Sequence, residues 1–140
     1  MNVSRYMTEK LITVPPDLWL KEAFLIMHTH RVRHIPVVEG DRLVGIVSDR
    51  DLRRPRWAEE LDDWTTYYQV KDNHSVSEVM TPDPETVRAS DDILHAVRVF
   101  RDRRYGALPV LNEKDELVGI LSAQDLLGAL EEFLVREKEG

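Results

Sequence analysis

Two short segments of the chain place a hydroxyl and a carboxylate at the same spacing. Ser48 is followed by Asp51, and Ser122 is followed by Asp125, with two residues between the partners in each case. A serine hydroxyl can bond a phosphate or sugar oxygen, and a carboxylate can accept bonds from two adjacent ribose hydroxyls. A helix that begins at such a serine adds free N–H groups and a positive dipole end, which favour a phosphate. Both segments are therefore candidates for nucleotide binding.

The same spacing also fits a purely structural role. In a capping box, the serine caps a helix and the acidic residue at the third helical position bonds back to the serine N–H. Two observations favour more than a cap. The pair recurs in the chain, and each serine follows an apolar strand-like segment that contains a glycine, Gly45 or Gly119. Glycine inside a strand often marks the close approach of a ligand or of another backbone.

The two segments belong to a long internal repeat. Residues 7–52 recur as residues 80–126, with an offset of 73 up to Pro36/Pro109 and of 74 from Leu43/Leu117. The identical pairs include Met7/Met80, Thr8/Thr81, Val14/Val87, Ala23/Ala96, Arg31/Arg104, Val37/Val110, Val44/Val118, Ile46/Ile120 and Leu52/Leu126. A repeat of this length is a supersecondary unit that buries its apolar face against a neighbouring unit. We expect two units that face each other with pseudo-two-fold symmetry and create two related clefts.

Each repeat predicts the element order β-α-β-β-α, and the whole chain an α+β fold. The first copy predicts a strand at 11–14, a helix from 18 to about 30 capped by Asp17, a hairpin of 35–38 and 43–47, and a short helix after Ser48. The second predicts a strand at 85–87, a helix capped by Ser90, a hairpin of 107–111 and 117–121, and a helix from 122 to about 137. The buried stripe expected for its first helix is Ile93, Ala96, Val97 and Phe100. Each strand–helix–strand portion should be a right-handed crossover.

The repeats define three segments: the first repeat at 1–56, a linker at 57–76 and the second repeat at 77–140. The linker is neither Gly/Ser-rich nor Pro-rich, as a flexible linker would be. It contains Trp57, Trp64, Tyr67 and Tyr68 among acidic residues. We expect these aromatic side chains to pack onto the units or onto a partner, and the alternative is that they stack on a ligand.

Composition limits the function classes. The chain has 140 residues, 42% of them apolar, a formal net charge of -7 and no cysteine. The negative charge argues against broad binding to nucleic acid or to an anionic membrane. Without cysteine there is no disulfide or thiolate chemistry. No apolar run approaches the roughly 18 residues that span a bilayer, and the N-terminus lacks a signal-peptide pattern. A cytoplasmic location is expected.

No pattern in the sequence predicts catalysis or a metal site. There is no Gly-rich phosphate loop and no nucleophile–base–acid set. His28 and His30 point in different directions on a helix and, with His34, offer too few zinc ligands. The arginines at 50, 53, 54 and 56 fit a solvated helix end, or a guide for an anionic ligand. The C-terminal stripe of Leu126, Leu127, Leu130, Phe133 and Leu134 is typical of a core or dimer contact.

With Met-Thr near the start, a Pro-Val strand and a Gly-x-x-Ser-x-x-Asp end in both copies, the chain resembles tandem CBS domains, which together form a Bateman module. The resemblance covers nearly the whole chain except the linker and the last few residues. Within that family it is similar to small stand-alone proteins of the acetoin-utilisation type, on the segments VSDRDL and EVMTPDP and the long linker. The resemblance implies a regulatory protein without cofactor, an adenine nucleotide or S-adenosylmethionine as ligand, and disc-like dimers.

The resemblance also implies roles for matching residues. Asp51 and Asp125 match the ribose-binding aspartate, and Ser48 and Ser122 match the hydroxyl that contacts ribose or phosphate. Arg33 and His34, before Pro36, match a basic pair that faces phosphate, whereas Gly106 and Ala107, before Pro109, remove that charge from the second copy. The backbone around Ile12–Thr13 and Glu85–Thr86 corresponds to the edge that contacts adenine.

The expected ligand-binding set is therefore Ile12, Thr13, Arg33, His34, Pro36, Ser48, Arg50, Asp51, Thr86, Ala107, Pro109, Ser122 and Asp125, with no catalytic and no metal residue. Asp49 would repel a phosphate unless Arg33 or Arg50 offsets its charge. One occupied site, in the first copy, is favoured over two. The leading hypothesis is a nucleotide-sensing module that acts through the shape of a homodimer or through an unidentified protein partner. The alternative is a ligand-free structural dimerisation module.

Overall fold

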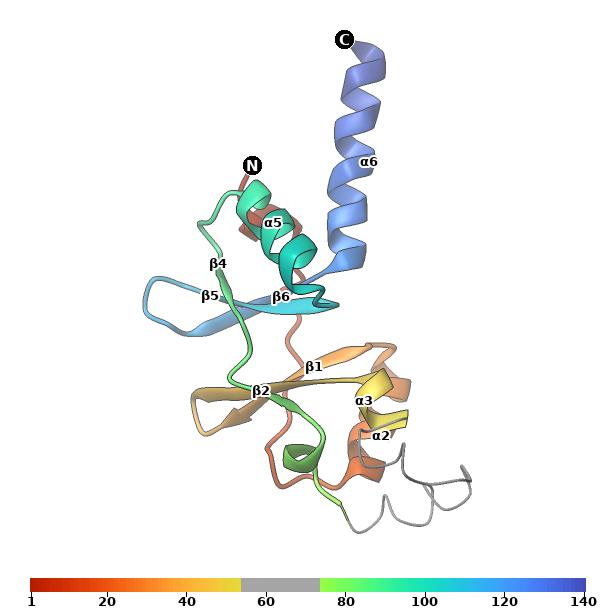
Figure 1. The fold of residues 1–140 in the computed structure, drawn as a ribbon, viewed down its shortest axis with the longest axis vertical. Coiled ribbons are helices and arrows are strands. Elements are labelled where there is room, and N and C mark those ends of the chain that lie inside the picture. The colour runs from red at the N-terminus through yellow and green to blue at the C-terminus, as the bar shows by residue number, and fades with distance from the viewer. Residues whose placement is uncertain (54–73) are drawn as a thin grey trace. The chain divides into compact units, whose positions relative to one another are not determined.

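The computed structural model describes residues 1–53 and 74–140, which form two units (Figure 1). Unit 1 consists of Met1–Leu11 together with Glu85–Gly140, and unit 2 consists of Ile12–Pro84. Both units mix helices with a three-stranded sheet, which confirms the α+β class. The four aromatic residues of the expected linker lie outside the described residues.

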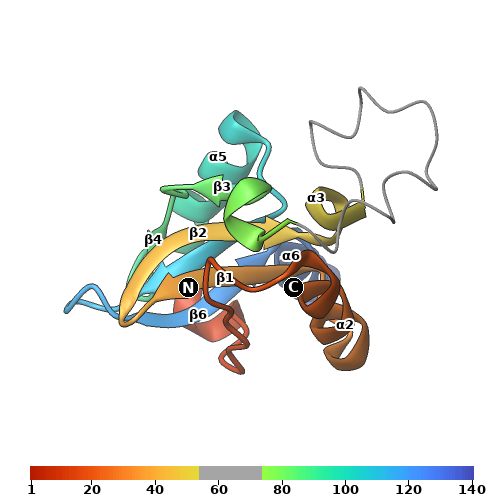
Figure 2. The ribbon, with the colours of Figure 1, turned by 90° about the horizontal axis from the view of Figure 1, so that it is seen from below.

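Unit 2 contains the hairpin of the first repeat. Strands β1 (His34–Glu39) and β2 (Arg42–Ser48) pair antiparallel, and Gly40 turns the chain between them with φ of 62°. Helix α2 (Leu20–His30) precedes the hairpin, and α3 (Asp49–Arg53) follows it. The 3-10 helix η3 (Val76–Glu78) leads into β3 (Thr81–Pro82), which pairs antiparallel with β2 (Figure 2).

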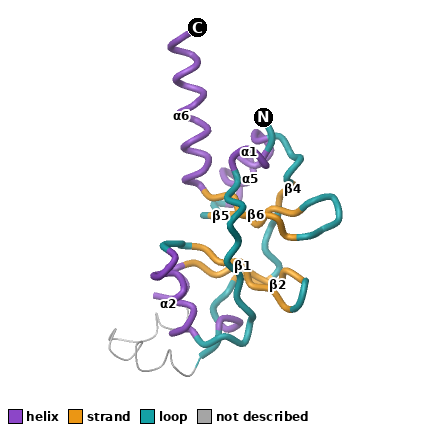
Figure 3. Tube along the Cα trace, turned by 180° about the vertical axis from the view of Figure 1, so that it is seen from behind, coloured by secondary structure: helices purple, strands orange, loops and turns teal. Residues whose placement is uncertain are grey.

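Unit 1 contains the hairpin of the second repeat. Strand β4 (Val87–Arg88) runs parallel to β5 (Ala107–Leu111), which pairs antiparallel with β6 (Leu117–Ser122). Helix α5 (Ile93–Arg103) connects β4 to β5, and the short α1 (Val3–Tyr6) comes from the N-terminus. The long helix α6 (Ala123–Glu139) extends beyond the other elements of this unit (Figure 3). In the described ranges, no helix is long and apolar enough to cross a membrane.

Each unit has its own apolar core. In unit 2 the core joins α2 to the hairpin through Val14, Leu20, Ala23, Met27, Ile35, Val37, Val47, Leu52 and Val76. In unit 1 it consists of Val3, Val87, Ile93, Ala96, Leu108, Val110 and Leu121. In the predicted stripe of α5, Ile93 and Ala96 are buried and Phe100 is partly buried. Val97, the fourth member of that stripe, is 40% exposed, so its predicted burial is wrong.

Helix starts and the first strand of each repeat differ from the predictions. Helix α2 begins at Leu20 and is capped by the backbone of Trp19, so the predicted cap Asp17 is wrong. Helix α5 is capped by Asp92, which accepts a bond from the Leu94 N–H at 2.9 Å, whereas Ser90 donates to Glu113. The predicted strand at 11–14 is reduced to one bridge, where Val14 meets Val37. A segment that pairs at one residue lacks the continuous ladder that defines a strand.

The sequence did not predict that the beginning of each repeat packs in the other unit. Met7 and Thr8 lie against Gly119 in unit 1, where Thr8 and Ile120 exchange backbone hydrogen bonds of 2.8 and 3.0 Å. Met80 and Thr81 lie against Gly45 in unit 2. A Cβ atom at Gly45 would stand 3.0 Å from the Thr81 carbonyl oxygen, and one at Gly119 would stand 3.0 Å from that of Thr8. In both strands, therefore, glycine admits another backbone rather than a ligand.

Candidate ligand-binding sites

Both Ser-x-x-Asp segments form complete capping boxes. In unit 2, the Ser48 N–H donates to Asp51 Oδ2 at 2.9 Å, and the Asp51 N–H donates to Ser48 Oγ at 3.0 Å. In unit 1, the equivalent distances between Ser122 and Asp125 are 2.8 and 3.1 Å. The box fixes both side chains at the start of α3 or α6, at the point where the hairpin ends.

These bonds leave polar capacity on both side chains. Each serine oxygen accepts a bond in the box, so its O–H remains free to donate. Each aspartate uses Oδ2, and among the described residues no bond is made to the Oδ1 of Asp51 or Asp125. All four side chains are half-buried. Helix capping and ligand binding are thus chemically compatible in this geometry.

In unit 2 the basic pair lies next to the capping box. His34 is the register partner of Ser48, and the Asp49 N–H donates to the Arg33 carbonyl oxygen at 2.8 Å. Burial lowers the pKa of His34 below its ordinary value, the carboxylates of Asp49 and Asp51 oppose that shift, and Arg33 adds to it. An imidazole and two carboxylates therefore share one small region, with the exposed Arg33 beside them.

The expected adenine edge of unit 2 adjoins β1. The Val14 N–H donates to the Pro36 carbonyl oxygen at 3.2 Å, and the Val38 N–H donates to the Val14 carbonyl oxygen at 2.9 Å. Just before this bridge, Ile12 and Thr13 make no backbone hydrogen bonds within the part of the chain that the structure describes. The side chain of Pro36 is buried. Pro36 therefore contributes through its carbonyl oxygen, which accepts the Val14 N–H and positions this edge.

Unit 1 repeats the geometry without the charges. Ala107 is the register partner of Ser122, and the Ala123 N–H donates to the Gly106 carbonyl oxygen at 3.1 Å. Ala107 and Pro109 are buried, and Thr86 is half-buried just before β4. The backbone positions of the basic pair are thus kept, but they carry no cation.

One cation near the expected adenine edge of unit 1 was not predicted from the sequence. Arg103, at the end of α5, lies 3.8 Å from the carboxylate of Glu85. The arginine-rich end of this helix could have indicated it. Because Glu85 offsets its charge, Arg103 does not replace the missing basic pair.

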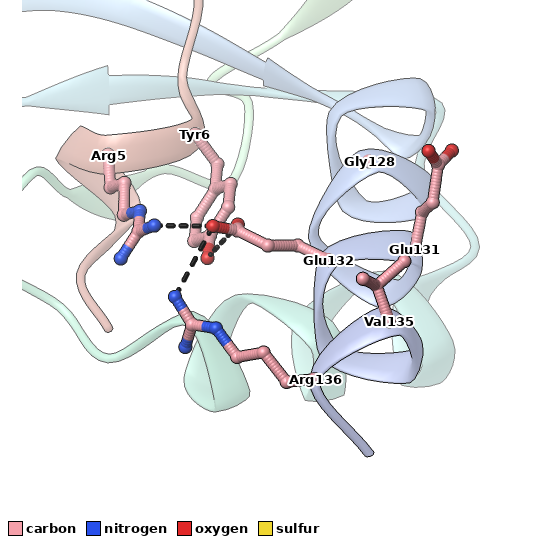
Figure 4. A pocket seen from close by; sticks show the side chains of 7 residues that line it. All are labelled: Arg5, Tyr6, Gly128, Glu131, Glu132, Val135 and Arg136. Carbon is pink, nitrogen blue, oxygen red and sulfur yellow. Dashed lines mark hydrogen bonds and ion pairs between the residues drawn. The ribbon is translucent and has the colours of Figure 1, made fainter. Parts of the chain in front are cut away.

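In a depression between α1 and α6 of unit 1, the charged side chains of the lining pair with one another (Figure 4). The carboxylate of Glu132 accepts a bond from the Tyr6 hydroxyl at 2.8 Å and pairs with Arg5 and Arg136. The Tyr6 hydrogen bond is the main cause that lowers the pKa of Glu132 and raises that of Tyr6. The network attaches α1 to α6, and its arginines are already paired.

A second depression, in unit 2, has an acidic lining. It is formed by Pro16, Asp17, Trp19, Glu39, Ser75, Ser77 and Glu78. The hydrogen bond from His74 is the main cause that lowers the pKa of Glu78, which keeps that carboxylate ionised. Such a surface repels an anionic ligand, so the regions around the two capping boxes remain the candidate nucleotide sites.

Comparisons with known proteins agree with the repeat. The sequence profile of the CBS domain matches residues 3–56 and 76–132. A CBS domain-containing protein of Dictyostelium discoideum is 32% identical over 133 residues, which cover 91% of this chain and 90% of that protein. Inosine-5'-monophosphate dehydrogenase of Thermoplasma acidophilum is 32% identical over 115 residues, but these make up only 21% of the enzyme.

Solved structures of CBS-domain pairs are also similar to this chain. The CBS-pair protein CBSX2 from Arabidopsis thaliana has a TM-score of 0.80 at 27% identity, with 94% of this chain and 95% of that chain covered. Its complex with AMP has a TM-score of 0.74 at 27% identity, covering 94% and 97%. The CBS domain pair of protein MJ0100, in complex with 5'-methylthioadenosine and S-adenosylmethionine, has a TM-score of 0.77 at 20% identity, covering 94% and 97%, and supports the fold alone.

Proposed function

The chain belongs to the CBS domain family, whose stand-alone pairs are regulatory rather than catalytic, and we propose that it senses an adenine nucleotide. The proposed ligands are AMP, ADP, ATP and S-adenosylmethionine. A relative of similar length binds AMP, and a structural neighbour binds 5'-methylthioadenosine and S-adenosylmethionine. The ligand changes the shape of a homodimer, or its affinity for a protein partner. A ligand acts in this way only through different affinities for the two states.

One observation carries this proposal. In unit 2, the Ser48–Asp51 box, the basic residues Arg33 and His34 and the unpaired backbone of Ile12–Thr13 belong to neighbouring positions around β1. Together they offer an acceptor for ribose hydroxyls, cations for phosphate and backbone groups for a purine edge. The unit 1 site has the box without the cations, so we propose that nucleotides bind in unit 2.

Asp49 adds a condition to this proposal. Its carboxylate opposes an anionic ligand, and the exposed guanidinium groups of Arg33 and Arg50 are the groups that can offset it. A ligand with fewer phosphate charges would meet less repulsion. The proposal therefore ranks AMP and S-adenosylmethionine ahead of ATP. The expected cytoplasmic location stays a prediction.

The alternative function is a dimerisation module that binds no nucleotide. The complete hydrogen bonding of both capping boxes favours it, because a helix start alone accounts for those bonds. A variant that separates the two roles of Asp51, together with ligand titration of the wild type, distinguishes the alternatives.

Asp51→Asn is that variant. Its amide oxygen can still accept the Ser48 N–H, whereas the negative charge and one acceptor oxygen are lost. We expect titration calorimetry with the four ligands to show affinity lowered about tenfold or more. The unfolding free energy should stay within about 1 kcal/mol of wild type. For the wild type, ligand at about 100 times Kd should add about 2.7 kcal/mol of stability.

Asp125→Asn is the matched control in unit 1. It makes the same change in the equivalent capping box, Ser122–Asp125. It should leave nucleotide affinity unchanged if unit 2 holds the site. If none of the four ligands binds to the wild type, the sensing proposal is wrong and the dimerisation module is the better account. Equal losses in both variants would indicate two occupied sites.

A further inference from the structure

The imidazole of His34 is half-buried at the start of β1, and the backbone around it is held by two contacts. Ser48 on β2 is its register partner, and next to this pair the Asp49 N–H donates to the Arg33 carbonyl oxygen at 2.8 Å. Side chains that lie directly opposite each other in an antiparallel pair are on the same face of the sheet. The imidazole is therefore on the same face as the Ser48–Asp51 capping box, and the paired backbone keeps it there.

The ring of His34 has room for one more proton. Neither ring nitrogen has a hydrogen-bond or ion-pair partner among residues 1–53 and 74–140. A neutral imidazole accepts a proton on its free nitrogen, and the imidazolium that results has two N–H donors. Burial lowers the pKa of His34, while the carboxylates of Asp49 and Asp51 oppose that shift and Arg33 adds to it. At neutral pH the imidazole is therefore largely uncharged.

The fixed charges around the capping box balance one another. Within the described residues, the charges that act on His34 come from Asp49 and Asp51 on α3 and from Arg33 before β1. With the exposed Arg50 of α3, these side chains carry two negative and two positive charges. A phosphate monoester adds about two negative charges at neutral pH, because its second pKa is about 6. Of these side chains, His34 is the one whose charge can change to meet the phosphate.

We propose that a phosphate-bearing nucleotide binds to unit 2 together with a proton, which His34 takes up from solvent. The proton adds to the free ring nitrogen, and no bond of the nucleotide is made or broken. The imidazolium then adds a charge-assisted donor to the guanidinium of Arg33 beside it. This inference rests on the proposed function and adds a regulator to it, because nucleotide affinity rises as the pH falls. Unit 1 has Ala107 in the equivalent position, opposite Ser122, so a ligand bound there would take up no proton in this way.

The pH dependence follows from the charge of the imidazole in the free chain and in the complex. Phosphate stabilises the imidazolium, so the pKa of His34 is higher in the complex than in the free chain. Below the pKa of the free chain, His34 is charged in both states, and above the pKa of the complex it is neutral in both. Between these limits each nucleotide takes up as much as one proton, and its dissociation constant rises up to about tenfold for each pH unit.

Titration calorimetry with AMP, in buffers of different ionisation enthalpy, measures this proton. Near neutral pH the wild type should take up about half a proton or more per AMP, and the dissociation constant should be about tenfold higher near pH 8 than near pH 6.5. His34→Gln should remove both effects. His28→Gln, at an exposed position of α2, is the matched control and should keep both. Adenosine, which lacks the phosphate, should cause no proton uptake.

An NMR titration of the histidine rings tests the wild type itself, with the His34→Gln spectrum to assign the resonance. Addition of AMP should raise the pKa of His34 by about one unit, which is a tenfold effect, and leave that of His28 unchanged. AMP binding without proton uptake, or uptake that persists in His34→Gln, would overturn the inference while leaving the proposed function intact. No AMP binding between about pH 5.5 and 8.5 would refute the proposed function for this ligand, and the inference with it.

Discussion

At the scale of single residues, His34 connects the electrostatics of unit 2 with its candidate site. It begins β1, pairs in register with Ser48 and is close enough to Asp49 and Asp51 for their charges to affect it. Since burial lowers its pKa, the folded chain favours the neutral imidazole. The site therefore changes its charge at a lower pH than an exposed histidine would.

This shift predicts a loss of stability in mild acid. Below the ordinary histidine pKa the unfolded chain binds a proton that the folded chain resists, so the unfolding free energy falls as pH drops through that range. The loss is complete once the pH is below the lowered pKa of the folded state. His34→Gln should flatten this part of the profile when the unfolding free energy is measured in urea between about pH 5 and 8.

His28→Gln is the control for this measurement, because His28 is exposed at the end of α2. It should keep the wild-type profile. A His34→Gln profile as steep as that of the wild type would contradict the assigned role of burial.

Residue-scale features followed from the sequence where they are local. Both capping boxes were predicted, because all their bonds lie within four consecutive residues. The sequence predicts Ser90 as the cap of α5, and this prediction is wrong, because Asp92 occupies the position next to Ile93. Three polar residues in a row offer competing caps, and packing of Ile93 into the core selects among them.

At the scale of elements, the third strand of unit 2 depends on a glycine. β3 pairs with β2 at Gly45 and Ile46, and Met80 lies over Gly45. Both hairpins and the end of α2 at His30 were predicted, because their patterns involve neighbours in sequence. The strands that pair with Thr8 and Thr81 could not be predicted, because a two-residue strand has no periodicity that identifies its neighbour.

Gly45→Ala should destabilise the chain by about 1–3 kcal/mol. The new Cβ would lie 2.5 Å from Met80 Sδ and 3.0 Å from the Thr81 carbonyl oxygen. The methionine can move, but the backbone of β3 must shift. Urea unfolding measures the loss.

Gly128→Ala is the control, because an added Cβ at this α6 position meets nothing within 4 Å. It should raise the unfolding free energy by about 0.5–1 kcal/mol, as expected for alanine in place of glycine in a helix. If both variants are equally stable, β3 does not pack against Gly45 as described.

At the scale of the whole molecule, sequence repeats and compact units are not the same sets of residues. The first eleven residues belong to unit 1, although the rest of the first repeat belongs to unit 2. Val3 is completely buried in the unit 1 core, and its N–H donates to the Asp91 carbonyl oxygen at 2.9 Å. Changes in residues 1–11 should therefore lower the stability of the second repeat, which forms most of unit 1.

Removal of residues 1–11 should destabilise unit 1 by about 3 kcal/mol or more, from one buried valine and several backbone hydrogen bonds. In hydrogen exchange, amides of β5 and β6 should exchange about 100-fold faster, while those of β1 and β2 stay protected. Val3→Ala is a milder variant that should show the same location of the effect. Faster exchange confined to unit 2 in either variant would contradict the assignment of this segment.

The packing of residues 1–11 in unit 1, apart from the rest of the first repeat, has a consequence for synthesis on the ribosome. Residues 12–84 can fold once Pro84 has left the ribosomal exit tunnel, because all the contacts within unit 2 are then available. The N-terminal segment cannot, since Gly119 and Ile120 are translated more than a hundred residues after it. Until Gly119 and Ile120 are synthesised, Met7 and Thr8 lack the partners that they have in the folded unit. A chain released between the two events would expose this apolar segment, and exposed apolar segments are what chaperones bind.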